Sequence, residues 1–145
     1  MKVTPMNEIV NILVVDDDDV TAETVRRSLR KLGDHFHIVE AGDGQEALDI
    51  MRGHSSKRLH RPYLTLLDLN MPRMNGFEFL EAVRADPVLA SAVIFVLSTS
   101  DSDADRTRAY KDQVAGYMLK TAIGPQMLRL TTLLHDYAQS VRLPL

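Results

Sequence analysis

The chain has 145 residues, 45% hydrophobic and 26% charged, which is the composition of an ordinary globular protein and the length of one domain rather than two. Its formal net charge of -3 predicts no nucleic-acid surface, and the absence of cysteine excludes disulfides, thiolate catalysis and cysteine zinc sites. No stretch has the length of a signal-peptide core or a membrane span, so we expect a cytoplasmic protein without membrane contact.

Five short apolar segments recur along the chain and predict β-strands. They lie at residues 12–15, 35–39, 64–67, 93–97 and 116–119. Three of them are nearly continuous in apolar or β-branched residues, which is typical of parallel strands that are covered on both faces. We therefore expect helical sequence between them.

Apolar residues three or four positions apart follow four of these strands and predict helices. The stripes are Val25, Leu29 and Leu32; Ala47, Leu48 and Met51; Phe77, Leu80 and Val83; and Met127, Leu130, Leu134, Tyr137 and Val141. A polar, basic insertion at residues 53–62 predicts a surface loop in which Lys57, Arg58 and Arg61 are solvated. The alternation of strand and helix predicts an open parallel α/β sheet with right-handed crossovers.

The segment after the fourth strand predicts a helix with little apolar surface. Residues 102–113 offer a core only Ala104, Ala109 and Tyr110. Asp101 or Ser102 can cap this helix, and Asp103 and Asp105 lie in its first turn, where the helix dipole favours acids. We expect it to be among the least stable elements.

Polar residues stand at the carboxyl ends of four of the predicted strands, where ligands of parallel sheets gather. Asp16 and Asp17 follow the first strand, and Asp68 follows the third. Ser98 and Lys120 follow the fourth and fifth. Alone, the run of aspartates that begins at Asp16 would be a solvated turn and helix cap. Three carboxylates at one edge, however, would repel one another unless a cation neutralised them, and Mg²⁺ and Lys120 meet that need.

These residue types suit phosphoryl transfer, which depends chiefly on positioning and charge neutralisation. Beside a bound metal, Asp68 can act as an oxygen nucleophile toward a phosphoryl group. Lys120 can pair with the phosphoryl oxygens, and the hydroxyl of Ser98 can donate a hydrogen bond to one of them.

Four motifs in chain order resemble those of the CheY-like receiver family of response regulators. They are ILVVDD at 12–17, LLDLNMP at 66–72 with Asn75-Gly76, VLSTS at 96–100 and AGYMLK at 115–120. The resemblance covers residues 11–138 and implies a flavodoxin-like α/β fold, with a five-stranded parallel sheet of order 2-1-3-4-5 and five helices. It places the receiver domain at residues 11–140, with an N-terminal tail at 1–10 and a C-terminal tail at 141–145.

The resemblance also implies a Mg²⁺-dependent phosphorylation of Asp68 by a histidine kinase. Asp16 and Asp17 would hold the metal, one directly and one largely through water, and the backbone carbonyl of Asn70 would complete the metal site with Asp68. Ser98 stands at the hydroxyl position of the family.

Two further positions and two departures follow from the same resemblance. Lys120 stands at the position of the family's lysine, and Tyr117 stands at that of its switch aromatic, although a strand tyrosine can equally be core packing. Thr121 replaces the proline that usually follows the lysine in a cis peptide, so either a strained cis peptide or a different loop is expected. Ser98 replaces the commoner threonine and keeps the hydroxyl donor.

The expected function is a phosphorylation-dependent protein-interaction switch without an output domain of its own. The sequence of residues 68–72 and the insertion at residues 53–62 are most similar to those of small stand-alone regulators paired with phytochrome-type histidine kinases. The resemblance implies a downstream protein target and often a homodimer through the fourth helix, fifth strand and fifth helix. Two alternatives stay open: an aspartyl-phosphate phosphatase, against which Asn70 stands where a general acid is needed, and a phosphorylation-independent adaptor.

Overall fold

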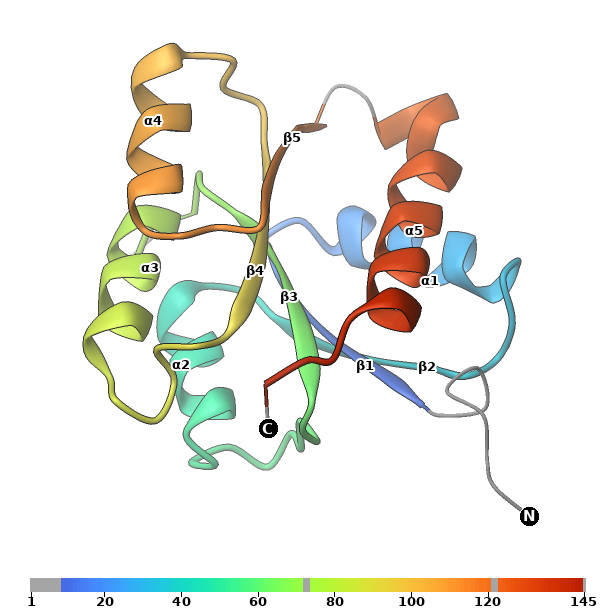
Figure 1. The fold of residues 1–145 in the computed structure, drawn as a ribbon, viewed down its shortest axis with the longest axis horizontal. Coiled ribbons are helices and arrows are strands. Elements are labelled where there is room, and N and C mark those ends of the chain that lie inside the picture. Colours follow the sequence, from blue (N-terminus) through green and yellow to red (C-terminus); the bar gives the residue numbers. More distant parts are fainter. Residues whose placement is uncertain (1–8, 72–73, 121–122, 145) are drawn as a thin grey trace.

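The computed structural model describes residues 9–71, 74–120 and 123–144, with the backbone alone for 123–128. Strands and helices alternate along the chain (Figure 1). The elements are β1 (Val10–Val15), α1 (Asp19–Arg30), β2 (Phe36–Ala41), α2 (Gly44–Met51), β3 (Tyr63–Asp68), α3 (Gly76–Ala85), β4 (Val93–Ser98), α4 (Asp103–Lys111), β5 (Gly116–Leu119) and α5 (Ile123–Ser140). The strands form one parallel sheet of order β2-β1-β3-β4-β5, which confirms the predicted fold class.

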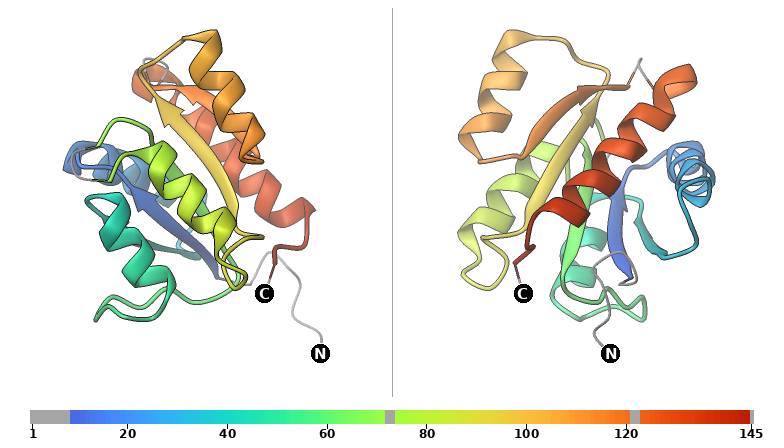
Figure 2. Two further views of the ribbon diagram at one scale, coloured as in Figure 1. Left: turned by 90° about the vertical axis from the view of Figure 1, so that its left-hand side faces the viewer. Right: turned by 45° about the vertical axis from the view of Figure 1, so that its right-hand side comes forward.

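The sheet separates two apolar cores, one on each face. Helices α2, α3 and α4 cover one face, and α1 and α5 cover the other (Figures 1 and 2). Successive residues of β1 point to opposite cores, with Leu13 and Val15 in the first and Ile12 and Val14 in the second. Every residue of β1 and β3 is buried, because central parallel strands are covered on both sides.

The predicted helix stripes face these cores, with one exception. Those of α1, α2 and α3 are buried or packed against buried residues, and so are Leu130, Leu134 and Tyr137 of α5. The prediction for Val141 is wrong, because α5 ends at Ser140 and Val141 is 41% exposed. The side chain of Met127 lies outside the described residues. Within the described ranges, no helix is long and apolar enough to cross a membrane.

Helix α4 has the least apolar contact with the rest of the molecule. Ala109 is buried, but Ala104 and Tyr110 are exposed, so the prediction that these two face the core is wrong. The hydroxyl of Ser102 accepts a hydrogen bond from the backbone N–H of Asp105 at 3.2 Å and caps the helix. Polar contacts must therefore hold most of α4 in place.

Arg84 of α3 fastens two neighbouring loops. Its guanidinium donates hydrogen bonds to four backbone carbonyl oxygens at 2.7–3.1 Å, those of Asp112, Gln113, Ala90 and Ala92. Asp112 and Gln113 directly follow α4, so these bonds anchor the C-terminal end of that helix to α3. Only the planar fork of arginine can serve so many acceptors at once.

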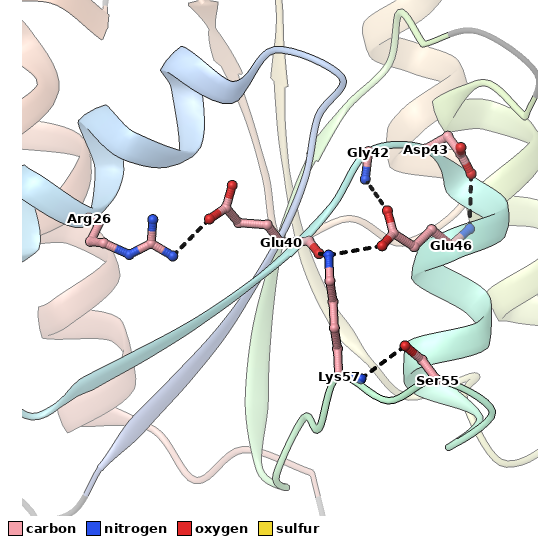
Figure 3. Close-up of polar contacts among 7 residues, drawn as sticks. All are labelled: Arg26, Glu40, Gly42, Asp43, Glu46, Ser55 and Lys57. Atoms are coloured by element: carbon pink, nitrogen blue, oxygen red, sulfur yellow. Dashed lines mark hydrogen bonds and ion pairs between the residues drawn. The ribbon is translucent and has the colours of Figure 1, made fainter.

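The insertion between α2 and β3 is a surface loop, as predicted, but Lys57 is not simply solvated. Its Nζ donates a hydrogen bond to the carbonyl oxygen of Glu40 at 2.8 Å and lies 2.9 Å from Oε2 of Glu46 (Figure 3). Glu46 also accepts from the backbone N–H of Gly42 at 2.7 Å, and this bond, aided by Lys57, lowers the pKa of Glu46. The loop is thereby fastened to the edge strand β2 and to α2.

Candidate functional site

The polar residues predicted at the strand ends lie together at one edge of the sheet. Asp16 follows β1 and Asp68 ends β3, its neighbour in the sheet. Ser98 ends β4, and Lys120 follows β5. The side chains of Asp16 and Asp68 are only 3% and 4% exposed, Ser98 is fully buried, and Asp17 faces solvent. The topology therefore brings Asp16, Asp17, Asp68 and Lys120 together in one acidic pocket, and Ser98 ends the strand next to that of Asp68.

The four consecutive aspartates after β1 have different roles. Asp16 points into the pocket, and its Oδ1 accepts a hydrogen bond from the backbone N–H of Asp18 at 2.9 Å. Asp18 in turn caps α1 by accepting from the N–H of Val20 at 2.9 Å. Asp19 lies in the first turn of α1. The prediction of a turn and helix cap thus holds for Asp18 and Asp19, whereas Asp16 and Asp17 belong to the acidic pocket.

Lys120 is the cation of the pocket. Its Nζ lies 2.9 Å from Oδ2 of Asp16 and 3.5 Å from Oδ2 of Asp68. Burial opposes the charge on this lysine, but its attraction to the two carboxylates outweighs burial and raises the pKa of Lys120. One ammonium group faces three carboxylates, those of Asp16, Asp17 and Asp68, so two negative charges remain when all are ionised.

Asp68 carries the clearest electrostatic signature in the pocket. Burial raises the pKa of Asp68 to about 6, against a hydrogen bond from the N–H of Asn70 that favours the carboxylate. The charge of Asp16 raises the pKa further, and that of Lys120 opposes the rise. Repulsion between Asp16 and Asp68 therefore contributes to the raised pKa of Asp68, but burial is its largest cause.

The donor set of the pocket fits a hard divalent cation. One carboxylate oxygen from each of Asp16, Asp17 and Asp68 lies within 4.8 Å of the others. Among the residues that the structure describes, this is the only group of three acidic or imidazole ligands so placed. Oxygen-only donors are the ligands of Mg²⁺ and Mn²⁺, and a divalent cation would cancel the two residual charges.

The loop after β3 closes tightly against the pocket. The backbone N–H of Asn70 donates to Oδ1 of Asp68 at 3.1 Å, and its side-chain amide donates to Oγ1 of Thr99 at 3.2 Å. The N–H of Gly76 donates to the carbonyl oxygen of Leu69 at 3.0 Å. A Cβ atom at Gly76 would lie 2.5 Å from Cα of Leu69, so only glycine fits at the start of α3.

Comparison with known protein families shows the family of the chain. Residues 12–132 match the response regulator receiver domain. The chain belongs to this family. Receiver domains are components of two-component signalling, typically phosphoacceptor proteins that histidine kinases phosphorylate rather than classical enzymes.

Individual relatives agree with this family. The receiver is 32% identical over 126 residues to the probable methanogenesis regulatory protein FilR2 of Methanothrix harundinacea. The aligned residues cover 87% of this chain and 81% of the relative. The crystal structure of the phosphorylated cyanobacterial phytochrome response regulator RcpA matches with a TM-score of 0.82 and 27% identity. The Mn²⁺-bound response regulator Rcp1 matches with a TM-score of 0.79 and 25% identity. Both matches cover 94% of this chain and 99% of the other.

The β4 side of the receiver contains the predicted hydroxyl and aromatic positions. Oγ of Ser98 accepts a hydrogen bond from the N–H of Ser100 at 3.0 Å, and the hydroxyl of Tyr117 donates to the carbonyl oxygen of Ser100 at 2.8 Å. Tyr117 also packs, partly buried, against the core under α2, α3 and α4. Core packing and contact with the β4–α4 loop are therefore both present.

Sequence reasoning missed the link between this loop and α4. The hydroxyl of Ser100 donates to Oδ2 of Asp105 at 2.7 Å. The polar run at 98–105 was the available signal, but its pattern does not say which side chains pair. The peptide between Lys120 and Thr121, and Pro72, lie outside the described residues.

Proposed function

We propose that Asp68 accepts a phosphoryl group in a Mg²⁺-dependent reaction and that the receiver, taken as residues 11–140, is a phosphorylation-dependent interaction switch. The observation that carries the proposal is one buried pocket in which Asp16 and Asp68 face Lys120, with Asp17 beside them. A pocket with surplus negative charge and a carboxylate of raised pKa is suited to a divalent cation and a phosphoryl group together.

The carboxylates of Asp16, Asp17 and Asp68, with the backbone carbonyl of Asn70, would hold the metal. Bound Mg²⁺ supplies neutralisation of the charge on the phosphoryl oxygens. Two relatives support this assignment, because RcpA was crystallised phosphorylated and Rcp1 with Mn²⁺, which shares the preference of Mg²⁺ for oxygen ligands.

The chain's own residues supply the rest of the chemistry. A carboxylate oxygen of Asp68 forms a bond to phosphorus while the bond from phosphorus to the donor's histidine nitrogen breaks, and that nitrogen keeps the electron pair. With a pKa of about 6, Asp68 is mostly ionised at neutral pH. Lys120, 3.5 Å from Oδ2 of Asp68, pairs with a phosphoryl oxygen, and the buried hydroxyl of Ser98 donates to another.

We propose a histidine kinase of the phytochrome type as the donor and a protein as the downstream target. The support is the similarity over nearly the whole chain to RcpA, which is named as a phytochrome response regulator. The two alternatives are less well supported. Asn70 donates its amide to Thr99 and offers no general acid for a phosphatase, and Lys120 reaches the pocket, which favours a phosphoacceptor over a phosphorylation-independent adaptor.

Intact-mass measurement after exposure to acetyl phosphate tests the proposal. We expect the wild type to gain one phosphoryl group with Mg²⁺ and none with EDTA, whereas Asp68→Asn gains none under either condition. Asp103→Asn is the matched control, because its carboxylate is 96% exposed on α4, and it should label like the wild type. Undiminished labelling of a folded Asp68→Asn variant, checked by circular dichroism, would contradict the proposal.

A further inference from the structure

We propose that Ser100 and Asp105 are positioning residues that join the hydroxyl of Ser98 to the first turn of α4 in one hydrogen-bonded unit. The inference rests on the proposed phosphorylation of Asp68, for which it names the connection between the pocket and α4. Among the described residues, the hydrogen bonds and ion pairs of Ser100 and Asp105 do not include Asp16, Asp17, Asp68 or Lys120. Their role is to orient Ser98 and to make the position of α4 depend on that orientation.

The first link joins Ser98 to Ser100. The backbone N–H of Ser100 donates to Oγ of Ser98 at 3.0 Å, so the Ser98 hydroxyl acts as an acceptor in this bond and keeps its own hydrogen for another partner. Ser98 is fully buried, so no water molecule from the surface can replace this bond without a local opening. Rotation of Ser98 toward a phosphoryl group on Asp68 must therefore move Ser100 or break the bond.

The second link joins Ser100 to α4. The hydroxyl of Ser100 donates to Oδ2 of Asp105 at 2.7 Å and accepts from the N–H of Ser102, the helix cap, at 3.2 Å. Its carbonyl oxygen accepts from the hydroxyl of Tyr117 at 2.8 Å. The backbone and side chain of Ser100 are thus all engaged, and the bond to the carboxylate of Asp105 is a short, charge-assisted one.

The apolar packing of α4 lies in its C-terminal half, away from the first turn. The only buried residue of the helix, Ala109, lies near its C-terminal end. Arg108, also in that half, stacks 4.1 Å from the centre of the Phe77 ring and lies 3.5 Å from Glu81 of α3. A helix fastened at one end by packing and at the other by Ser100 should pivot when the Ser100–Asp105 bond breaks.

The coupling must act in both directions. If the orientation of Ser98 biases α4 through Asp105, then loss of Asp105 must also change the behaviour of Ser98 in the pocket, because coupling free energies are reciprocal. Asp105 can therefore be tested from either end, by the stability of α4 and by the chemistry at Asp68.

The test compares Asp105→Ala with Asp103→Ala. Both variants remove one acid from the first turn of α4, but Asp103 is 96% exposed, pairs with Arg106 and does not contact Ser100. We expect Asp105→Ala to speed hydrogen exchange of the α4 amides and also to speed Mg²⁺-dependent labelling by acetyl phosphate, each by about fivefold relative to Asp103→Ala, because Ser98 is then free to turn toward Asp68. Asp105→Asn keeps an acceptor for Ser100 and should bring both rates most of the way back to those of the wild type.

A double-mutant cycle adds a second check. Ser100→Ala removes the same bond from its other side, together with the acceptor of the Ser102 N–H, so the double variant should change the labelling rate no more than Ser100→Ala alone. Equal behaviour of Asp105→Ala and Asp103→Ala, or additive rate changes in the double variant, would overturn the inference. If instead Asp68→Asn labels like the wild type, the proposed function fails, and exchange of the α4 amides still decides whether Asp105 holds the helix.

Discussion

At the scale of single residues, the surroundings of Asp68 disfavour its ionised carboxylate. Burial raises the pKa of Asp68 to about 6, whereas an unfolded aspartate titrates near about 3.9. Between these values the folded protein binds a proton that the unfolded chain does not, so this group's contribution to the free energy of unfolding falls as pH rises through that window. Above about pH 6 the metal-free fold carries the whole cost of the ionised carboxylate.

Asp68→Asn should therefore stabilise the metal-free protein, and the gain should depend on pH. We expect the free energy of unfolding of the variant to exceed that of the wild type by up to about 3 kcal/mol at neutral pH in EDTA. This difference should shrink toward pH 4. Urea unfolding at several pH values measures the difference. Lys120 stays charged throughout, because its pKa is raised and its stabilising contribution is lost only at strongly alkaline pH. A gain that is independent of pH would contradict the assigned cause.

At the scale of elements, the junction between β3 and α3 depends on the lack of a side chain at Gly76. A Cβ there would lie 2.5 Å from Cα of Leu69 and 2.8 Å from the carbonyl oxygen of Asp68, both backbone atoms that cannot turn aside. Helix propensity alone would favour alanine over glycine at this position by up to about 1 kcal/mol. The tertiary contact therefore opposes the local preference and places the start of α3 directly against the end of β3.

The sign of the stability change in Gly76→Ala tells the steric clash apart from helix propensity, because the clash destabilises the fold and the propensity of alanine stabilises it. We expect a loss of about 1–3 kcal/mol in the free energy of unfolding, together with slower labelling of Asp68, because the backbone at Leu69 must shift. Gly42→Ala is the matched control, since a Cβ there meets nothing closer than 3.6 Å and the variant should stay near the wild type. Chemical denaturation followed by circular dichroism gives both values, and a stabilised Gly76→Ala variant would refute the steric argument.

At the scale of the whole molecule, the acidic pocket exists only when three parts of the chain are folded together. Asp16 and Asp17 follow β1, Asp68 ends β3, and Lys120 follows β5. The unfolded chain does not hold these oxygens together, so a cation that binds the pocket must stabilise the fold by mass action.

Mg²⁺ should raise the thermal midpoint of the receiver. At a concentration one hundred times its Kd, the expected stabilisation is about 2.7 kcal/mol, and calorimetry against NaCl of equal ionic strength measures it. The gain should decline below about pH 6, where Asp68 takes up a proton that competes with the metal. Asp17→Asn removes an exposed ligand outside both cores and should lose most of the gain. An unchanged gain in this variant would exclude Asp17 from the metal site.

The sequence by itself determined the order of elements, the parallel sheet and the edge of the sheet at which Asp16, Asp68 and Lys120 meet. Continuous apolar strands and apolar helix stripes are local patterns, and parallel strands bring their carboxyl ends to one edge whatever the loops do. Asp16, Asp68 and Lys120 were therefore predictable as neighbours. Helix α4 was also predictable as weakly packed, because its lack of apolar residues is visible in composition alone.

Only the tertiary structure decided how these residues are connected. Lys120 lies closer to Asp16 than to Asp68, Ser100 pairs with Asp105, and Lys57 donates a hydrogen bond to β2. Each of these contacts depends on side-chain directions that the folded arrangement of the elements sets. Apolar burial is nondirectional and leaves a periodic trace in the sequence, whereas a hydrogen bond or ion pair needs two particular atoms at one distance and angle, which no local pattern encodes.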